Sequence, residues 1–298
     1  MPTTMQAAPH TLTETPRDAA TVIVLRDSSE GLQTLLLRRH AKMANMGGVY
    51  VFPGGKLERS DSDASATALL DQPPAQLQAQ LGEAGLDAAM AAGLHIAALR
   101  EALEECGLLL AEPHGREARL DAERARAMLD EGQGFAQVVA QLGLRLATRQ
   151  LAPWSRWITP MAPALATRRF DTRFFVAQAP QAQQARHDDH ETTDSLWIAP
   201  RQALQRYRDG AIELAPPQIM SLAQLARHAS VASAMAAARA QRPPTILPES
   251  FEENGVRVIC YPGDPMHPVH QRAMDGPTRL AQQGRRFLPP QGFDALFL

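Results

Sequence analysis

Three glutamates stand close together in the segment REALEECG, residues 100 to 107. Glu101, Glu104 and Glu105 are spaced i, i+3 and i+4, so a helix would bring all three onto one face. Like charges at this spacing repel one another by roughly a few tenths of a kcal/mol per pair. A divalent cation such as Mg²⁺ or Mn²⁺ would offset this repulsion, because both ions prefer carboxylate oxygens. The alternative is a solvated surface helix, with Arg100 forming an ordinary salt bridge at its edge.

A pair of glycines lies upstream, in the segment VFPGGKLERSD, residues 51 to 61. Gly54 and Gly55 permit unusual backbone conformations directly after a predicted strand. Such a turn can direct backbone carbonyls or amides at a metal ion or a phosphate. Asp61 follows six residues after Gly55. Together with the acidic helix, this loop favours a metal or phosphate site over a plain surface helix.

The elements that would position these residues alternate irregularly along the chain, which indicates an α/β mixed sheet packed by helices. Two apolar, β-rich runs separated by a short polar turn predict a hairpin. A glycine after the acidic segment predicts where its helix ends. The predicted strands are 21–27, 31–39, a short one within 47–55, 157–160, 169–180, 195–200 and 255–261. The predicted helices are 94–107, two within 121–146, 200–210 and one long helix over 215–240, with residues 62–93 helical in composition.

The overall composition excludes several classes of protein. The chain has 298 residues, with 30 basic and 32 acidic side chains, a balance that argues against a nucleic-acid coat or a polybasic membrane surface. The sequence contains no run of 18 apolar residues, so no membrane span is expected. Two cysteines form neither a disulfide framework nor a CxxC zinc motif, so a reducing, cytoplasmic location is expected. Residues 1–19 are expected to be a loose tail, not a secretory signal.

The glycine loop and the acidic helix together resemble the box of the Nudix hydrolases. That box reads Gly, five residues, Glu, seven residues, then Arg-Glu-apolar-x-Glu-Glu-x-Gly-apolar. Gly55 matches the first glycine, Asp61 stands at the position of the first glutamate, and residues 100–108 match the second half. The departure is the gap, because residues 62–99 number 38 where the family has seven. A helical excursion can leave the loop before the helix and return to it without breaking the site.

One branch of the family, related to animal peroxisomal coenzyme A diphosphatases, also carries a long insertion inside the box. A further stretch, residues 35–55, partly resembles the signature of coenzyme A-type Nudix enzymes. Arg39, Gly48 and the run from Phe52 to Gly55 fit that signature, whereas His40 and Ala44 depart from it. Other stretches that look like the branch are WITP (157–160), RFDTRFF (169–175), HETTDSLWIAPRQAL (190–204) and LAPPQIMSLAQL (214–225).

The resemblance implies a Nudix α/β/α sandwich with a mixed sheet. It implies metal-dependent hydrolysis of a nucleoside diphosphate derivative, with coenzyme A or acyl-CoA cut to 3',5'-ADP and a phosphopantetheine as the leading reaction. The alternatives are hydrolysis of ADP-ribose or a dinucleotide, and a non-catalytic module that senses a nucleotide. The presence of all three glutamates favours an enzyme. The expected division is a Nudix domain at 20–245, with helical insertions at 62–93 and 111–150, and a C-terminal extension at 246–298.

The resemblance also assigns roles within the box. Glu101, Glu104 and Glu105 are the expected metal ligands, with the Gly55 carbonyl as an addition. Arg100 would orient a glutamate, supported by Gly54 in the loop and by Asp61, which either pairs with the arginine or caps the loop. The expected cofactor is Mg²⁺ or Mn²⁺.

Residues outside the box are predicted with open alternatives. Glu191 is the candidate acid outside the box, as ligand or base, with Asp171 as the runner-up that could instead pair with an arginine. The candidate substrate contacts are Arg39, Phe52, Arg168 and Arg173, and salt bridges are the alternative for Arg168 and Arg173.

Trp154 and Trp157 either stack on a base or pack in the core. Cys106 is expected to be a buried thiol. Two histidines within residues 186–191 are a weak zinc signal. The expected partner is a small nucleotide substrate; a homodimer is left open.

Overall fold

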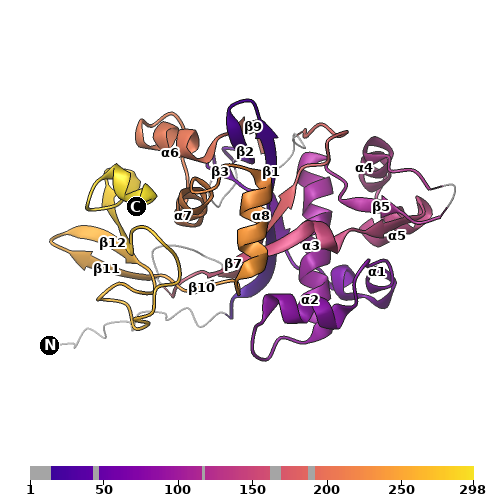
Figure 1. Ribbon diagram of the computed structural model, residues 1–298, viewed down its shortest axis with the longest axis horizontal. Helices are drawn as coiled ribbons and strands as arrows, with labels where there is room; N and C mark the ends of the chain where they lie inside the picture. The colour runs from indigo at the N-terminus through magenta and orange to yellow at the C-terminus, as the bar shows by residue number, and fades with distance from the viewer. Residues whose placement is uncertain (1–14, 43–46, 116–117, 162–168, 187–191) are drawn as a thin grey trace, which may run out of the picture.

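A mixed sheet of eight strands forms the centre of the fold in the computed structural model (Figure 1), which describes residues 15–42, 47–115, 118–161, 169–186 and 192–298. β1 (Arg17–Ser28) pairs in parallel with β8 (Phe170–Gln178) and forms the predicted hairpin with β2 (Gly31–Arg39). The order is β10-β7-β8-β1-β2-β3, with β4 on β1 and β9 on β2. The other strands are β3 (Tyr50–Val51), β4 (Gly54–Lys56), β7 (Leu151–Ile158), β9 (Thr192–Ile198) and β10 (Thr245–Ile246).

Side chains alternate between the two faces of this sheet. Along β1, Val22 and Val24 pack with α3 (Ala88–Cys106), while Ile23 and Leu25 pack against helices on the other face. Those helices are α6 (Pro200–Arg208), α7 (Pro216–Leu225) and α8 (Val231–Ala240). Figure 1 shows α3 and α8 in separate layers. The arrangement is the predicted α/β/α sandwich.

The insertion inside the box leads directly into the acidic helix. It begins at the end of η1 (Arg59–Ser62) and contains α1 (Ala64–Thr67) and α2 (Pro74–Leu81), and α3 follows. The prediction that this helix starts at residue 94 was wrong, because Asp87 caps it by accepting a hydrogen bond from the Met90 amide at 2.7 Å. The last turns of the insertion therefore belong to the same helix as the glutamates.

The second insertion contains the two predicted helices, α4 (Ala122–Asp130) and α5 (Phe135–Gln141). They are flanked by the antiparallel pair β5 (Ala111–Pro113) and β6 (Leu144–Leu146), and η2 (Thr148–Gln150) follows. Apolar side chains of α5 join the core on the α3 side of the sheet.

The predicted long helix over 215–240 was wrong, because α7 ends at Leu225 and α8 begins at Val231. Ser230 caps α8 by accepting from the Ser233 amide at 3.2 Å. The Val231 amide donates to Asp27 Oδ1 at 2.9 Å, which ties the start of α8 to the sheet. A local cap and a tertiary contact together place the break.

The C-terminal extension forms a second sheet, where the sequence predicted one strand. Its antiparallel strands are β11 (Glu249–Glu253), β12 (Val256–Cys260), β13 (Arg279–Gln283) and β14 (Arg286–Leu288), followed by η3 (Phe293–Phe297). The Tyr207 hydroxyl on α6 accepts from the Phe287 amide at 2.7 Å. Tyr261 and Leu280 are buried with the α6, α7 and α8 side chains. The extension therefore completes one side of the main core.

No helix among the described residues is long and apolar enough to cross a bilayer.

Candidate active site

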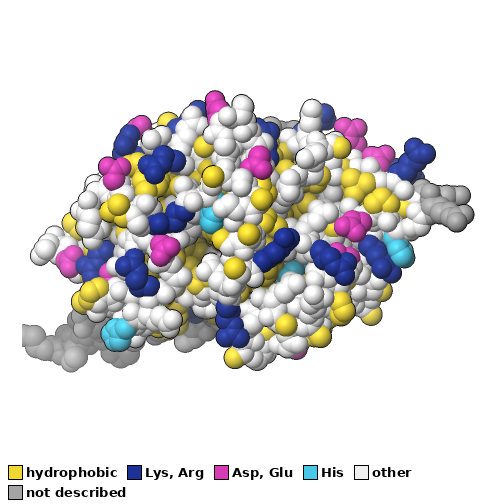
Figure 2. All heavy atoms as spheres, viewed as in Figure 1, with side chains coloured by type: hydrophobic (Ala, Val, Ile, Leu, Met, Phe, Trp, Pro, Cys, Tyr) yellow, Lys and Arg dark blue, Asp and Glu magenta, His cyan; other side chains and the backbone are white. Residues whose placement is uncertain are grey.

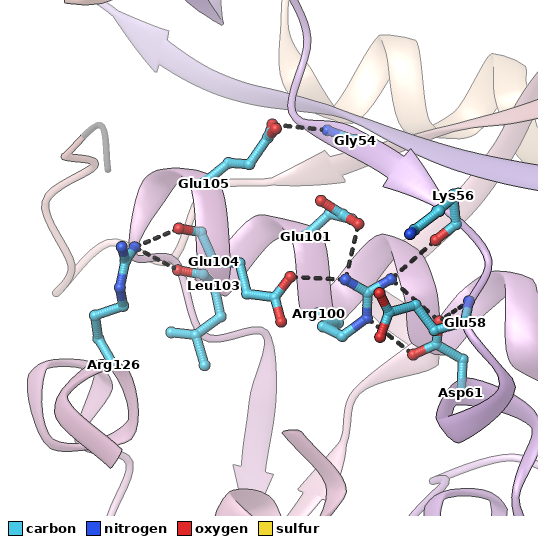
Figure 3. Close-up of polar contacts among 10 residues, drawn as sticks. All are labelled: Gly54, Lys56, Glu58, Asp61, Arg100, Glu101, Leu103, Glu104, Glu105 and Arg126. Carbon is cyan, nitrogen blue, oxygen red and sulfur yellow. Dashed lines mark hydrogen bonds and ion pairs between the residues drawn. The ribbon is translucent and has the colours of Figure 1, made fainter. Parts of the chain in front are cut away.

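The C-terminal half of α3 presents the three glutamates toward the glycine loop (Figure 3). Glu101 and Glu105 are buried, and Glu104 is partly exposed. The helix ends at Gly107, whose φ of 67° is left-handed and suits glycine. Its amide and that of Leu108 donate to α3 carbonyls, both at 3.0 Å. This cap fixes the last turn, which carries two of the acids.

Arg100 lies at the centre of the acidic face and joins both halves of the motif. Its Nε donates to Asp61 Oδ1 at 2.9 Å, a contact between residues 39 positions apart. Its Nη1 donates to Glu101 Oε1 at 2.8 Å and to Glu104 Oε2 at 2.7 Å. Its Nη2 donates to the Lys56 carbonyl at 3.1 Å. The guanidinium thus contacts two glutamates and the loop, and Asp61 both pairs with it and accepts from the Glu58 amide at 2.9 Å.

The glycine loop lies against Glu105 and Glu101. The Gly54 amide donates to Glu105 Oε2 at 2.9 Å. A Cβ at position 55 would lie 2.7 Å from the Glu101 carboxyl carbon, closer than side chains approach. Glycine at this position therefore makes room for the Glu101 carboxylate.

Burial makes ionisation of this acidic face costly. Desolvation raises the pKa of Glu101 to about 7, against the opposing effect of Arg100 and with a further increase from Glu104. Desolvation also raises the pKa of Glu104, again opposed by Arg100. The face therefore favours an additional positive charge.

A residue of the second insertion supports the end of α3. Arg126 on α4 donates from Nη1 to the carbonyls of Leu103, at 3.3 Å, and of Glu104 (Figure 3). A cation at a helix C-terminus is stabilised by the carbonyls that have no partner within the helix. Sequence reasoning missed Arg126, because nothing in its own segment indicates which helix it contacts.

The acids do not form a ready-made metal cage. Within the described ranges, no three His, Cys, Asp or Glu side chains are grouped closely enough to hold a metal ion. Arg100 and the Gly54 amide bind the carboxylates instead. The donor set nevertheless suits a hard divalent cation, since Glu101 and Glu105 lie beside a loop that has no side chain at Gly55, and Glu104 shares Arg100 with Glu101.

Comparison with known families decides the assignment, because residues 2–225 match the NUDT19 Nudix domain. The chain belongs to this family. A match over the box, both insertions and the helices that follow confirms the resemblance drawn from the motif.

Several named proteins are similar to this chain over the Nudix domain. The chain is 29% identical over 238 residues to the acyl-coenzyme A diphosphatase NUDT19 of Gallus gallus, covering 67% of this chain and 62% of that protein. It is 28% identical to the Homo sapiens protein of the same name, covering 68% and 63%. The chain thus spans less than two thirds of these relatives. A putative Nudix hydrolase 7 of Caenorhabditis elegans is 24% identical, covering 92% of this chain and 82% of its own.

A solved Nudix structure supports the fold. The crystal structure of a NUDIX hydrolase from Alicyclobacillus acidocaldarius matches with a TM-score of 0.58 and 26% identity. The match covers 75% of this chain and 97% of that one. The α/β Nudix fold with mixed sheet and helices is therefore established.

Arg173, a predicted substrate contact, lies instead in a buried ion-pair cluster. The cluster joins β8 to the insertion that leads into α3, the Nudix helix. Arg173 is 3% exposed and donates to Glu83 of the insertion at 2.9 and 2.7 Å, and to Asp18. Asp171 accepts from Arg156 at 2.8 and 2.6 Å, as its alternative role predicted. The structure thus favours the ion-pair alternative for Arg173 and Asp171.

The other predicted substrate contacts differ in their surroundings. Phe52 is 2% exposed and packs edge-on against Phe174, with ring centroids 6.5 Å apart, so its side chain belongs to the core. Arg39 ends β2, and its Nε is buried with no hydrogen-bond partner in the described part of the chain. Arg168 and Glu191 lie outside the described residues, as do residues 187–190 of the histidine-rich segment.

Two further predictions concern buried side chains. Cys106 is a buried thiol, as expected, and its Sγ donates to the Ala102 carbonyl at 2.9 Å. Trp154 and Trp157 are largely buried in the core on the face of the sheet away from the Nudix helix. Core packing was one of the two roles predicted for these tryptophans.

Proposed function

We propose that this protein is a metal-dependent Nudix diphosphatase that cleaves coenzyme A or acyl-CoA to 3',5'-ADP and (acyl-)phosphopantetheine. The carrying observation is that the two halves of the box meet although 38 residues separate them. Arg100 binds Asp61 and Glu105 binds the Gly54 amide. The substrate class is supported by relatives named acyl-coenzyme A diphosphatase. The match covers the Nudix domain, where the diphosphate chemistry would occur.

The proposed metal is Mg²⁺ or Mn²⁺, held by Glu101, Glu104 and Glu105 with the Gly55 carbonyl. When bound, it would neutralise charge on the diphosphate and supply an activated water. Glu101 and Glu104 fit such an ion because burial raises the pKa of each and a nearby cation would favour the ionised form. The chain offers hard oxygen donors here and no thiolate.

The residues of the chain would then act by positioning. Arg100 holds the Glu101 and Glu104 carboxylates in fixed orientations, and the Gly54 amide holds Glu105. Transfer of a phosphoryl group depends on placement and electrostatics more than on covalent catalysis. The contacts that orient the glutamates should therefore raise the rate.

Substrate contacts are proposed outside the box. Arg39 has a buried Nε without a described partner, which suits an anionic substrate group. Arg168 and Glu191, which the structure does not describe, stay in the proposal as a phosphate contact and as an acid outside the box. Phe52 and Arg173 are left out, because their side chains are committed to the core and to ion pairs. A homodimer and a cytoplasmic location stay predictions.

The deciding experiment is a substrate panel with Mg²⁺ and Mn²⁺, read by product analysis. Release of 3',5'-ADP from a coenzyme A species is expected. ADP-ribose and a dinucleotide belong in the panel because Ala44 replaces a basic residue of the coenzyme A signature. Cleavage of these two without release of 3',5'-ADP would remove the leading substrate and keep the Nudix chemistry.

A variant tests the chemistry itself. Glu105→Gln keeps the side-chain size and should lower metal-dependent kcat by about 100-fold or more, which corresponds to about 3 kcal/mol in the barrier. Glu252→Gln on exposed β11 is the matched control and should leave kcat unchanged. Undiminished turnover by a folded Glu105→Gln protein would contradict the proposed role of the box.

A further inference from the structure

A cavity of about 420 Å³ lies on the face of the sheet opposite the Nudix helix. It is open to solvent on one side and is lined by β7, α7, α8, β10 and residues 272–275 of the extension. A volume of this size falls within the range of roughly 300–1,000 Å³ for small-molecule sites. The proposed reaction makes no use of this cavity.

A buried hydroxyl, that of Ser221, lies in the lining of the cavity. Ser221 on α7 is 2% exposed, and its Oγ has no hydrogen-bond partner among the residues that the structure describes. An unpaired buried polar group costs about 1–3 kcal/mol, so such groups usually face a ligand or water. Nearby, Ser155 Oγ accepts from Trp157 Nε1 at 3.2 Å. The lining of the cavity therefore includes two serine hydroxyls, those of Ser221 and Ser155.

Two indole rings supply the flat apolar part of the lining. Trp154 and Trp157 are mostly buried by the core, and both also line the cavity. Trp154 packs edge-to-face with His228 and Trp157 with Tyr261, with ring centroids 6.0 and 5.8 Å apart respectively. Aromatic walls of this kind bind flat rings well.

Two arginines add positive charge to the lining. Arg227 and Arg272 are exposed, and each donates to a backbone carbonyl, of Leu298 and Gly276 respectively. Asp275 is the one acidic residue among the described lining. Burial, with a smaller effect of Arg227, lowers the pKa of His228. In Figure 2, basic side chains and a histidine are visible between the positions of α8 and the C-terminal sheet.

We propose that this cavity is a second ligand site that binds a nucleoside phosphate, with the base against Trp154 and Trp157 and the phosphate at Arg227 and Arg272. A ring nitrogen or exocyclic group of the base would pair with Ser221. A plain alkyl chain fits less well, because it would leave the Ser221 hydroxyl unpaired. The site is independent of the proposed reaction, since α3 and this cavity lie on opposite faces of the sheet.

Intrinsic fluorescence gives a direct test, because the chain has three tryptophans and two of them line the cavity. Trp197→Phe removes the third, which lies on β9 beneath Arg26. In this background, AMP added without metal should change the emission saturably. Ribose 5-phosphate, which lacks the base, should bind at least about tenfold more weakly.

Variants locate the binding. In the Trp197→Phe background, Ala237→Phe on α8 should fill the cavity and abolish the AMP response. Arg227→Gln and Arg272→Gln, at exposed positions, should each weaken AMP binding about tenfold, and the matched Arg239→Gln outside this cavity should not. Circular dichroism checks that each variant is folded. Glu105→Gln should leave AMP binding unchanged, so failure of this site and failure of the proposed function are distinguishable.

Three outcomes would overturn the proposal. The first is the absence of a saturable AMP response in the Trp197→Phe protein. The second is an AMP response that persists in folded Ala237→Phe protein. The third is saturable binding of dodecanoate by a cavity that does not bind AMP, which would show an acyl site instead.

Discussion

Gly55 and Arg100 decide how the carboxylates of the box are arranged. Arg100 contacts two glutamates and the aspartate of the loop, which explains why an arginine with several donors stands there. Gly55 contributes by having no side chain, because its Cα faces the Glu101 carboxylate. The site therefore depends on Arg100, whose side chain lies between the acids, and on Gly55, whose missing side chain makes room for the Glu101 carboxylate.

Replacement of Gly55 tests the second requirement. In Gly55→Ala, the new Cβ would displace the Glu101 carboxylate, which is the end of a flexible side chain. We expect unfolding free energy to change by less than about 1 kcal/mol and kcat to fall by about tenfold or more. Gly134→Ala is the control, because its φ of −72° is ordinary and no atom lies within 4 Å of its new Cβ. Equal kcat values for Gly55→Ala and wild type would show that the reaction does not depend on the position of the Glu101 carboxylate.

His95 gives stability a pH dependence that does not involve the three glutamates of the box. It is fully buried on α3, its Nδ1 lies 2.8 Å from the Ala91 carbonyl, and its ring centroid is 4.6 Å from that of Phe175. Burial lowers the pKa of His95 from 6.5 to about 4, against smaller opposing effects of Ala91 and Asp71. The unfolded chain therefore binds this proton more readily than the folded chain does.

The sign of the effect follows from that difference. The stability due to neutral His95 is complete above pH 6.5 and is lost as the pH falls toward 4, by about 3 kcal/mol. We expect denaturant unfolding of wild type to show this loss and His95→Gln to lack that part of it. Parallel pH curves for the two proteins between pH 6.5 and 4 would contradict the prediction.

At the scale of elements, the insertion inside the box is bound to the sheet by a buried ion pair. Glu83, between α2 and α3, accepts from Arg173 Nε at 2.9 Å and lies 3.0 Å from Arg156 Nη1. Both arginines stand on strands next to one another, β7 and β8. Through Glu83, the insertion and α3 are held against the sheet that also carries the glycine loop.

Removing the charge of Glu83 should loosen this attachment. Glu83→Gln leaves two arginines with less compensation, so we expect a loss of about 2 kcal/mol in unfolding free energy. Faster amide hydrogen exchange is expected in α2. Glu252→Gln, on an exposed strand, should change the unfolding free energy by less than about 0.5 kcal/mol. Unchanged exchange in α2 would show that apolar packing alone holds the insertion.

Local signals predicted some elements and missed others for physical reasons. The β1–β2 hairpin and the end of α3 at Gly107 follow from alternation and from a glycine cap, which neighbouring residues determine. The β11–β12 turn was predictable too, because Asn254 and Gly255 have φ of 53° and 76°, as a two-residue hairpin turn requires. The contacts of Arg126 and Glu83 were not predictable, since both partners come from distant segments.

At the scale of the molecule, the sheet separates two cores, and the extension belongs to one of them. Ile259, Tyr261 and Leu280 of the extension are buried with α6, α7 and α8. Trp157 on β7 packs edge-on against Tyr261, with ring centroids 5.8 Å apart. The Nudix domain and the extension therefore share buried surface, and we expect them to unfold together.

Leu280→Ala tests this coupling. Leu280 is fully buried on β13, so the cavity left by alanine should cost about 2–5 kcal/mol in unfolding free energy. Because the core is shared, hydrogen exchange should accelerate by the same factor in β12 and in α3, provided that both exchange by global unfolding. Leu247→Ala, at a position 37% exposed, is the matched control and should cost less than about 1 kcal/mol. Acceleration confined to β12, with α3 unchanged, would show that the extension unfolds by itself and that the core of the Nudix domain is stable without it.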